Sequence, residues 1–153
     1  MPSPRELGAR LDTLLAQGEA LVARLPIRAL DRPLPSRGGC VRDLAFRLFR
    51  WALAYVDGMD MGERPEAWLR ESAPPDLVDG PAVARYGALV RGRIAGWFEG
   101  AGAAEFTRVI ETGRGPQTGH ALLDHAISQA EEQLRDLHAL AVELGGPPAG
   151  ELP

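Results

Sequence analysis

The sequence predicts an all-α protein built as a four-helix bundle. Three observations support this prediction: four stretches carry apolar residues at helical spacing, segments rich in Pro and Gly separate them, and the length of 153 residues suits one domain with a real core. We therefore expect a single helical domain over residues 1–145. The tail over residues 146–153, rich in Pro and Gly, is expected to be flexible.

The four helices are expected over residues 3–25, 41–59, 81–99 and 120–145. Ser3 followed by Pro4 is a start signal for the first helix, and Thr118 is the expected cap of the fourth. In the fourth helix the apolar residues advance by alternating steps of four and three, which makes one continuous seam; they are Leu123, Ile127, Ala130, Leu134, Leu137, Ala141 and Leu144.

Two connecting segments have predictions of their own. The stretch over residues 62–81 holds four prolines and reads as a long connection, within which residues 65–70 could form one helical turn around Trp68. Residues 105–112 have apolar positions without helical spacing, so a short extended segment is expected there. The glycines at 113 and 115 read as a loop, because they lack the strand and acid of a nucleotide-binding motif.

Charge and composition exclude several classes of function. The net charge of −4 and the pI near 5.4 give no general attraction for nucleic acid or an anionic membrane. The single cysteine, Cys40, cannot form an internal disulfide, and the N-terminal segment resembles neither a signal peptide nor a membrane span. We therefore expect a cytoplasmic protein with no nucleic-acid or membrane partner.

The fourth helix places Gln129 and Gln133 one turn apart beside its apolar seam. Two histidines at this spacing would form the usual two-residue grip on a metal ion. An amide oxygen is a weak ligand for a transition metal, so the helix has the layout of a metal-binding helix without its chemistry.

Two segments, RDLAFRLFRWALAYVDG and LLDHAISQAEEQLRDLHALAVELG, resemble the DinB-like (YfiT-like) four-helix bundle superfamily. In that family the first segment typically reads Asn-Leu-x-x-His-Ile-Phe-Arg, and the second contains His-x-x-x-His. Matches to the motifs are Leu44, Phe49, Arg50, Arg135 and Leu137. The resemblance implies an up-down-down-up bundle, and it places the three metal-binding histidines of the family at Arg47, Gln129 and Gln133, where all three are replaced.

The replacements predict that the chain binds no metal and needs no cofactor, since a guanidinium has no electron pair to donate. Arg47 lies between Leu44 and Trp51 on one helix face, so it should point inward and need partners. Asp136 or Glu132 could supply a carboxylate, and the two glutamines could offer amide oxygens. Either this cluster only joins two helices, or Arg47 binds an anionic group of a small ligand in a pocket lined by Trp51 and Tyr55.

Other candidates carry weaker signals. Cys40 precedes the second helix, where a helix N-terminus could activate a thiol, although a lone cysteine is more often an inert packed residue. His120, Asp124 and His125 could begin a displaced metal site, but His125 lies about 100° around the helix from Asp124. His138 is expected to face solvent.

Two function classes remain open at this point. The first is a metal-free bundle that binds a small, anionic ligand or a protein partner without catalysis. The second, implied by the resemblance, is an enzyme of the thiol S-transferase type that acts on a low-molecular-weight thiol, with Arg47 holding the substrate or with a relocated metal at His120 and His125. We also predict a homodimer, with Trp68 and Trp97 as its interface residues.

Overall fold

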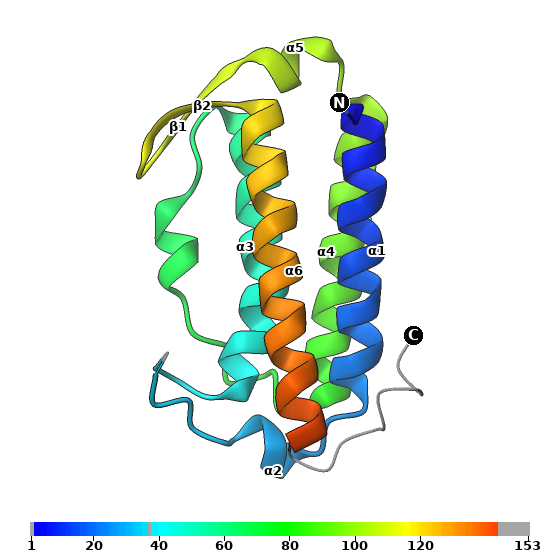
Figure 1. Cartoon of the computed structure of the whole chain (residues 1–153), viewed down its shortest axis with the longest axis vertical. Coiled ribbons are helices and arrows are strands. Elements are labelled where there is room, and N and C mark those ends of the chain that lie inside the picture. Colours follow the sequence, from blue (N-terminus) through cyan, green and yellow to red (C-terminus); the bar gives the residue numbers. More distant parts are fainter. Residues whose placement is uncertain (1, 37, 144–153) are drawn as a thin grey trace.

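Four long helices form the body of the protein (Figure 1). The computed structural model describes residues 2–36 and 38–143. The helices are α1 (Pro4–Ala23), α3 (Val41–Met61), α4 (Gly80–Gly100) and α6 (Gly119–Glu143), with the short α2 (Ile27–Leu30) between the first two. All four predicted helices are confirmed within a few residues at their ends. The expected tail at 146–153 and the seam residue Leu144 lie outside the described residues.

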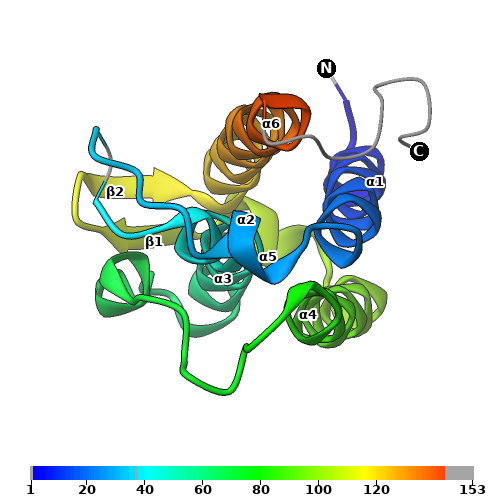
Figure 2. The ribbon, with the colours of Figure 1, turned by 90° about the horizontal axis from the view of Figure 1, so that it is seen from below.

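The helices run up, down, down and up in chain order, as predicted. Figures 1 and 2 show α1 and α6 running in one direction and α3 and α4 in the other, with α1 and α3 at opposite corners of the bundle. Both α1 and α3 pack against α4 and α6. The pair α3 and α6 is therefore antiparallel and adjacent. None of the helices in the described ranges is long and apolar enough to cross a membrane.

Side chains at the helix starts satisfy backbone groups that the helix leaves free. The Ser3 hydroxyl accepts a hydrogen bond from Glu6 N–H, and the Asp79 carboxylate accepts one from Ala82 N–H at the start of α4. The Thr118 hydroxyl accepts one from Ala121 N–H at 3.1 Å, which confirms the predicted cap of α6. At the other end of α3, Gly62 has a φ of 84°, a left-handed conformation that a residue with a side chain rarely adopts.

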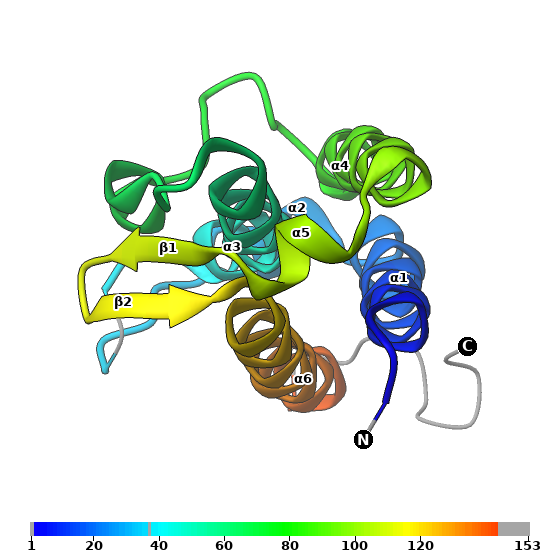
Figure 3. The ribbon, with the colours of Figure 1, turned by 90° about the horizontal axis from the view of Figure 1, so that it is seen from above.

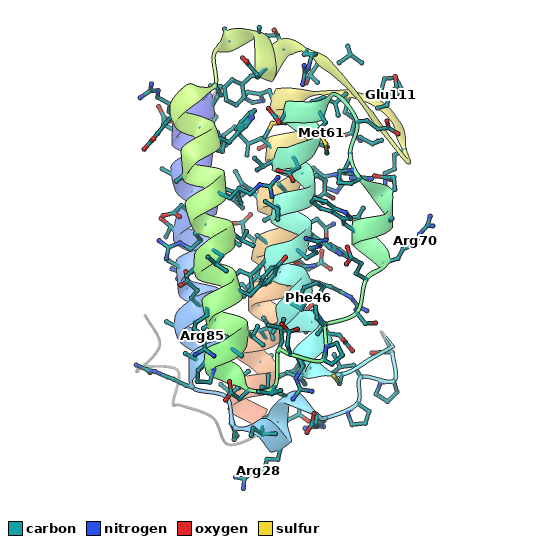
Figure 4. The ribbon with its side chains drawn as sticks, turned by 180° about the vertical axis from the view of Figure 1, so that it is seen from behind. Arg28, Phe46, Met61, Arg70, Arg85 and Glu111 are labelled. Carbon is teal, nitrogen blue, oxygen red and sulfur yellow. The ribbon has the colours of Figure 1, made fainter. Side chains whose placement is uncertain are left out.

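The core fills the space between the four helices with the apolar seams that the sequence predicts. Phe46, Phe49 and Leu48 of α3 are almost fully buried, and Leu123 and Leu137 of α6 are completely so. Figure 4 shows Phe46 inside the bundle. Gly87 of α4 is required by this packing, because the Phe49 ring occupies the place where a Cβ would lie. Removing a buried ring of this kind typically costs about 3–5 kcal/mol.

The connection from α3 to α4 carries η1 (Glu66–Arg70), a short 3-10 helix that confirms the predicted turn around Trp68. It packs against the outer side of α3. This placement covers the side of α3 that the other long helices leave open, as Figure 3 shows.

The segment before α6 differs in part from the prediction. Residues 103–107 form the helix α5 (Ala103–Thr107), because the Glu105 side chain caps its start by accepting from Gly102 N–H. Only β1 (Val109–Thr112) is extended, and it pairs antiparallel with β2 (Gly115–Thr118). The glycine loop is the turn of this hairpin.

The hairpin also pairs with the chain that follows α3. Arg64 N–H donates to Glu111 O at 2.8 Å, and Glu111 N–H donates to Gly62 O at 3.1 Å. In Figure 4, Glu111 lies close to Met61 at the upper end of α3. The hairpin is thus fixed beside the upper ends of α3 and α6.

Candidate functional site

The predicted site residues lie on α3 and α6, two helices that pack against each other. The rings of Tyr55 and His125 lie 5.3 Å apart, which fixes the level of one helix against the other. Because the helices are antiparallel and rise 1.5 Å per residue, we expect Trp51 and Gln129 at a common level about 6 Å lower, and Arg47 and Gln133 at a common level about 12 Å lower. We call these six residues the α3–α6 seam.

The lower part of the seam contains buried polar atoms without hydrogen-bond partners. Gln133 is 5% exposed, and its Oε1 accepts no hydrogen bond. The Nε1 of half-buried Trp51 is also buried and donates none. An unsatisfied buried polar atom costs about 1–3 kcal/mol, so each of these two atoms calls for an explanation.

Arg47 is half-buried and forms no hydrogen bond or ion pair with any residue of the described ranges. The carboxylate that interacts electrostatically with Arg47 is that of Asp43, one turn earlier on α3. The expected partners, Glu132 and Asp136, do not pair with Arg47. Gln129 is half-buried as well. The guanidinium therefore keeps its hydrogen-bonding capacity.

Asp43 itself is held by the backbone at the start of α3. Its carboxylate accepts hydrogen bonds from Cys40 N–H at 2.9 Å and from Ala73 N–H at 2.8 Å. Burial would raise the pKa of Asp43, but these hydrogen bonds, the Cys40 thiol and the charge of Arg47 together hold the pKa below its usual value. Asp43 thus remains charged near Arg47 without pairing with it.

Cys40 serves as the N-terminal cap of α3. Its thiol donates to Asp43 Oδ2 at 3.4 Å, and it borders a pocket of about 400 Å³ beside Arg42, Leu77 and Val78. The geometry therefore assigns Cys40 a capping role.

At the upper end of the seam lies a charged cluster that sequence reasoning missed. Arg64 is 4% exposed, and its guanidinium binds both carboxylate oxygens of Glu66 and lies 5.0 Å from the centre of the Tyr55 ring. Glu66 also accepts from Gly113 N–H at 2.7 Å, which ties η1 to the hairpin. These residues lie in connecting segments without periodicity, so no pattern in the sequence marks them.

The cluster changes the proton affinity of the two rings. Burial raises the pKa of the Tyr55 hydroxyl, and the positive charges of Arg64 and Arg114 partly oppose this effect. Burial lowers the pKa of His125, and the same two arginines lower it further. His125 is therefore a neutral imidazole at pH 7, able both to donate and to accept a hydrogen bond.

The proposed displaced metal site is not assembled by these histidines. His125 turns toward Tyr55, Asp124 is exposed, and His120 Nε2 lies 3.4 Å from Pro2 O. Over residues 2–36 and 38–143, no group of three or more His, Cys, Asp or Glu side chains is arranged to hold a metal ion. His138 is half-buried rather than fully exposed.

The two tryptophans proposed for a dimer interface both make contacts inside the chain. The Arg50 guanidinium lies 4.0 Å from the centre of the Trp68 ring and binds Glu71, which holds η1 against α3. Trp97 Nε1 donates to Asp60 at 3.2 Å, and its ring packs on Phe106. Both tryptophans are half-buried by these contacts.

Solved structures with the same arrangement come from Bacillus subtilis. A DinB-like protein, YjoA, superposes with a TM-score of 0.75 at 14% sequence identity, over 96% of this chain and 95% of its own. YfiT, described as a probable metal-dependent hydrolase with an unusual four-helix bundle topology, gives 0.74 at 15% identity, over 95% and 91%. The fold is that of the DinB-like bundles. No protein-family model matches the sequence, and no curated protein matches it at a significant level.

The residues present do not suit the metal that the DinB-like fold suggests. The three positions that the resemblance assigns to metal ligands hold Arg47, Gln129 and Gln133. A guanidinium repels a cation, and a single amide oxygen from each glutamine is a poor ligand for zinc or nickel. We therefore propose no metal-dependent reaction at these three positions.

Proposed function

We propose that this DinB-like bundle binds a small anionic molecule at the lower part of the α3–α6 seam, without a metal and without turnover. The observations that support the proposal are two buried polar atoms without a hydrogen-bond partner, Gln133 Oε1 and Trp51 Nε1, and the Arg47 guanidinium, which pairs with no described residue. A bound ligand would satisfy all three groups.

The free groups define the chemistry of the ligand. Arg47 and Trp51 offer only donors, and a planar guanidinium matches a carboxylate or phosphate in two parallel hydrogen bonds. Gln133 Oε1 is an acceptor, so the ligand should also carry a donor such as a hydroxyl or an amine. A small hydroxy acid or amino acid has both. Gln129 and the Tyr55 ring would border the same place.

The experiment is a screen of small carboxylates and phosphates by thermal shift, followed by calorimetry on those that stabilise the protein. We expect binding that is lost in Arg47→Leu and weakened in Gln133→Leu. Arg28→Leu is the matched control, because Arg28 is an exposed arginine of α2 and is not one of the seam residues. Native mass spectrometry of untreated protein adds an independent readout. Absence of bound mass and of any stabilising anion would overturn the proposal, as would full binding by Arg47→Leu.

The alternative is a thiol S-transferase in which Arg47 holds the carboxylate of a low-molecular-weight thiol. The observation that favours it is His125, a half-buried neutral imidazole in contact with Tyr55 on the same seam. A neutral imidazole can take the proton of a thiol and so create the attacking thiolate. Turnover of a thiol with an electrophile that disappears in His125→Phe would support this alternative over simple binding.

A further inference from the structure

The side of α4 that points away from the core is unusual for a surface helix. Val83, Val90 and Ile94 are buried, and the residues on the opposite side are all exposed. We call that side the outer face of α4; it consists of Arg85, Ala88, Leu89, Gly92, Gly96 and Glu99. Most of these residues are small or apolar, and Leu89 is 75% exposed. Figure 4 views the molecule from this side and shows Arg85 near the start of the helix.

The glycines of this face are not explained by packing within the chain. Gly87, on the inner side of the same helix, is filled by the Phe49 ring, whereas a Cβ at Gly92 or Gly96 would meet nothing within 4 Å. Glycine within a helix weakens it relative to alanine. The two glycines thus weaken α4 without helping the bundle.

The charges of the face are arranged symmetrically about Gly92. Arg85 precedes Gly92 by seven residues and Glu99 follows it by seven. Neither forms an ion pair with a residue that the structure describes. The arginines at the sides of the helix differ in this respect, because Arg91 pairs with Asp12 and Glu19, and Arg93 pairs with Asp57.

We propose that the outer face of α4 binds a second copy of this chain, with the two α4 helices antiparallel and the two-fold axis at Gly92. In this register Arg85 of one protomer faces the partner's Glu99, and the symmetry creates the same pair twice. The two-fold axis also sets Leu89 at the level of the partner's Ala95 and Ala88 at the level of the partner's Gly96, so only small residues lie opposite the largest apolar side chain of the face. Gly92 meets the partner's Gly92, which allows the helices to approach closely.

The dimer formed in this way is weak. One pair of helices buries less than the roughly 1,600 Å² of a standard stable interface, so dissociation in the micromolar range or above follows. The interface also differs from the one expected at Trp68 and Trp97, whose rings already have partners within the chain.

Charge reversal tests the register directly, with sedimentation equilibrium up to several hundred micromolar as the measurement. Arg85→Glu and Glu99→Arg each place like charges opposite one another, and each should raise the dissociation constant of the dimer roughly tenfold or more. The double variant, Arg85→Glu with Glu99→Arg, restores both pairs and should restore the dimer. Arg28→Glu, at an exposed position of α2 outside the outer face of α4, is the matched control and should leave the dimer unchanged.

Each outcome of this experiment decides the proposal. A wild-type chain that stays monomeric overturns it, and so does a dimer that survives both single reversals. Loss in both single variants without restoration in the double variant overturns the antiparallel register. Gly92→Glu gives a second test, since it puts two like charges at the axis while improving helix propensity. This variant should be a monomer with an undiminished melting temperature, whereas Ala121→Glu on α6 should remain a dimer.

Discussion

The ring of Tyr55 on α3 lies 5.3 Å from the imidazole of His125 on α6, inclined by 52°, and the Arg64 guanidinium lies 5.0 Å from the centre of the Tyr55 ring. This stack joins the two helices that carry the seam to the connection after α3. It also leaves His125 in a half-buried position close to positive charge, which makes folding sensitive to the protonation of one imidazole.

The first prediction concerns that sensitivity. The pKa of His125 in the folded chain lies below its usual value near 6.5, with burial as the main cause and Arg114 and Arg64 as further causes. The unfolded chain therefore binds more protons between the two pKa values, so stability falls as the pH drops below about 6.5. Melting temperatures measured from pH 7.5 down to pH 5.5 should decline less in His125→Phe than in the wild type. A His120→Phe control should keep the wild-type slope, and equal slopes in all three proteins would contradict the assignment.

The second prediction concerns Arg64. Replacing it by Leu removes both hydrogen bonds to Glu66 and leaves that carboxylate without its cation, next to the Tyr55 ring. Breaking a buried ion pair costs about 3–5 kcal/mol, but the Glu66 side chain is 33% exposed, so we expect about 2 kcal/mol in urea unfolding. Replacing both residues, Arg64→Leu with Glu66→Leu, should recover part of this loss. A single variant as stable as the wild type would show that the cluster contributes nothing to stability.

The helices and their order were predictable because their signal is local. Apolar steps of four and three mark the seam of α6, and Leu123 and Leu137 are indeed completely buried. The expectation that Arg47 lies opposite Gln133 could not come from periodicity, because only the resemblance related the two helices. The contact between the Tyr55 and His125 rings shows which level of α3 lies beside which level of α6.

The residues that sequence reasoning missed depend on contacts between distant segments. Arg64 and Glu66 acquire their surroundings only because the hairpin returns to donate from Gly113 and to pair at Glu111. The carboxylate near Arg47 was missed for a different reason. Asp43 acts through a capping box with Cys40, and cysteine is not one of the residues that normally signal a helix start.

The third prediction is that Arg47→Leu leaves stability nearly unchanged or raises it slightly. Arg47 has no hydrogen bond or ion pair with any described residue, and Asp43 keeps its backbone hydrogen bonds when Arg47 is removed. Removal of a half-buried, unpaired charge relieves its desolvation, so the change should lie within about 1 kcal/mol. Urea unfolding measures it. Destabilisation by several kcal/mol would show instead that Arg47 neutralises a buried carboxylate, in which case a role in ligand binding would lose its support.

The fourth prediction is that the purified protein contains no stoichiometric transition metal, whereas the triple change Arg47→His, Gln129→His and Gln133→His creates a site that does. Positions 129 and 133 lie one turn apart on α6, and the register set by Tyr55 and His125 brings position 47 to the same level as position 133. Three imidazoles there would supply the ligand set of an open zinc site, with a fourth position left for water.

Elemental analysis after dialysis against zinc or nickel distinguishes the outcomes. A variant with Gln129→His and Gln133→His alone is the control, since two ligands should bind the metal more weakly than three. One equivalent of metal in the unmodified protein would mean that other side chains bind it, with His120 and His125 as the first to replace. If the triple variant binds none, the Arg47 side chain does not face Gln129 and Gln133. The three free groups would then not belong to one site, and the proposed anion-binding function would fail with the metal design.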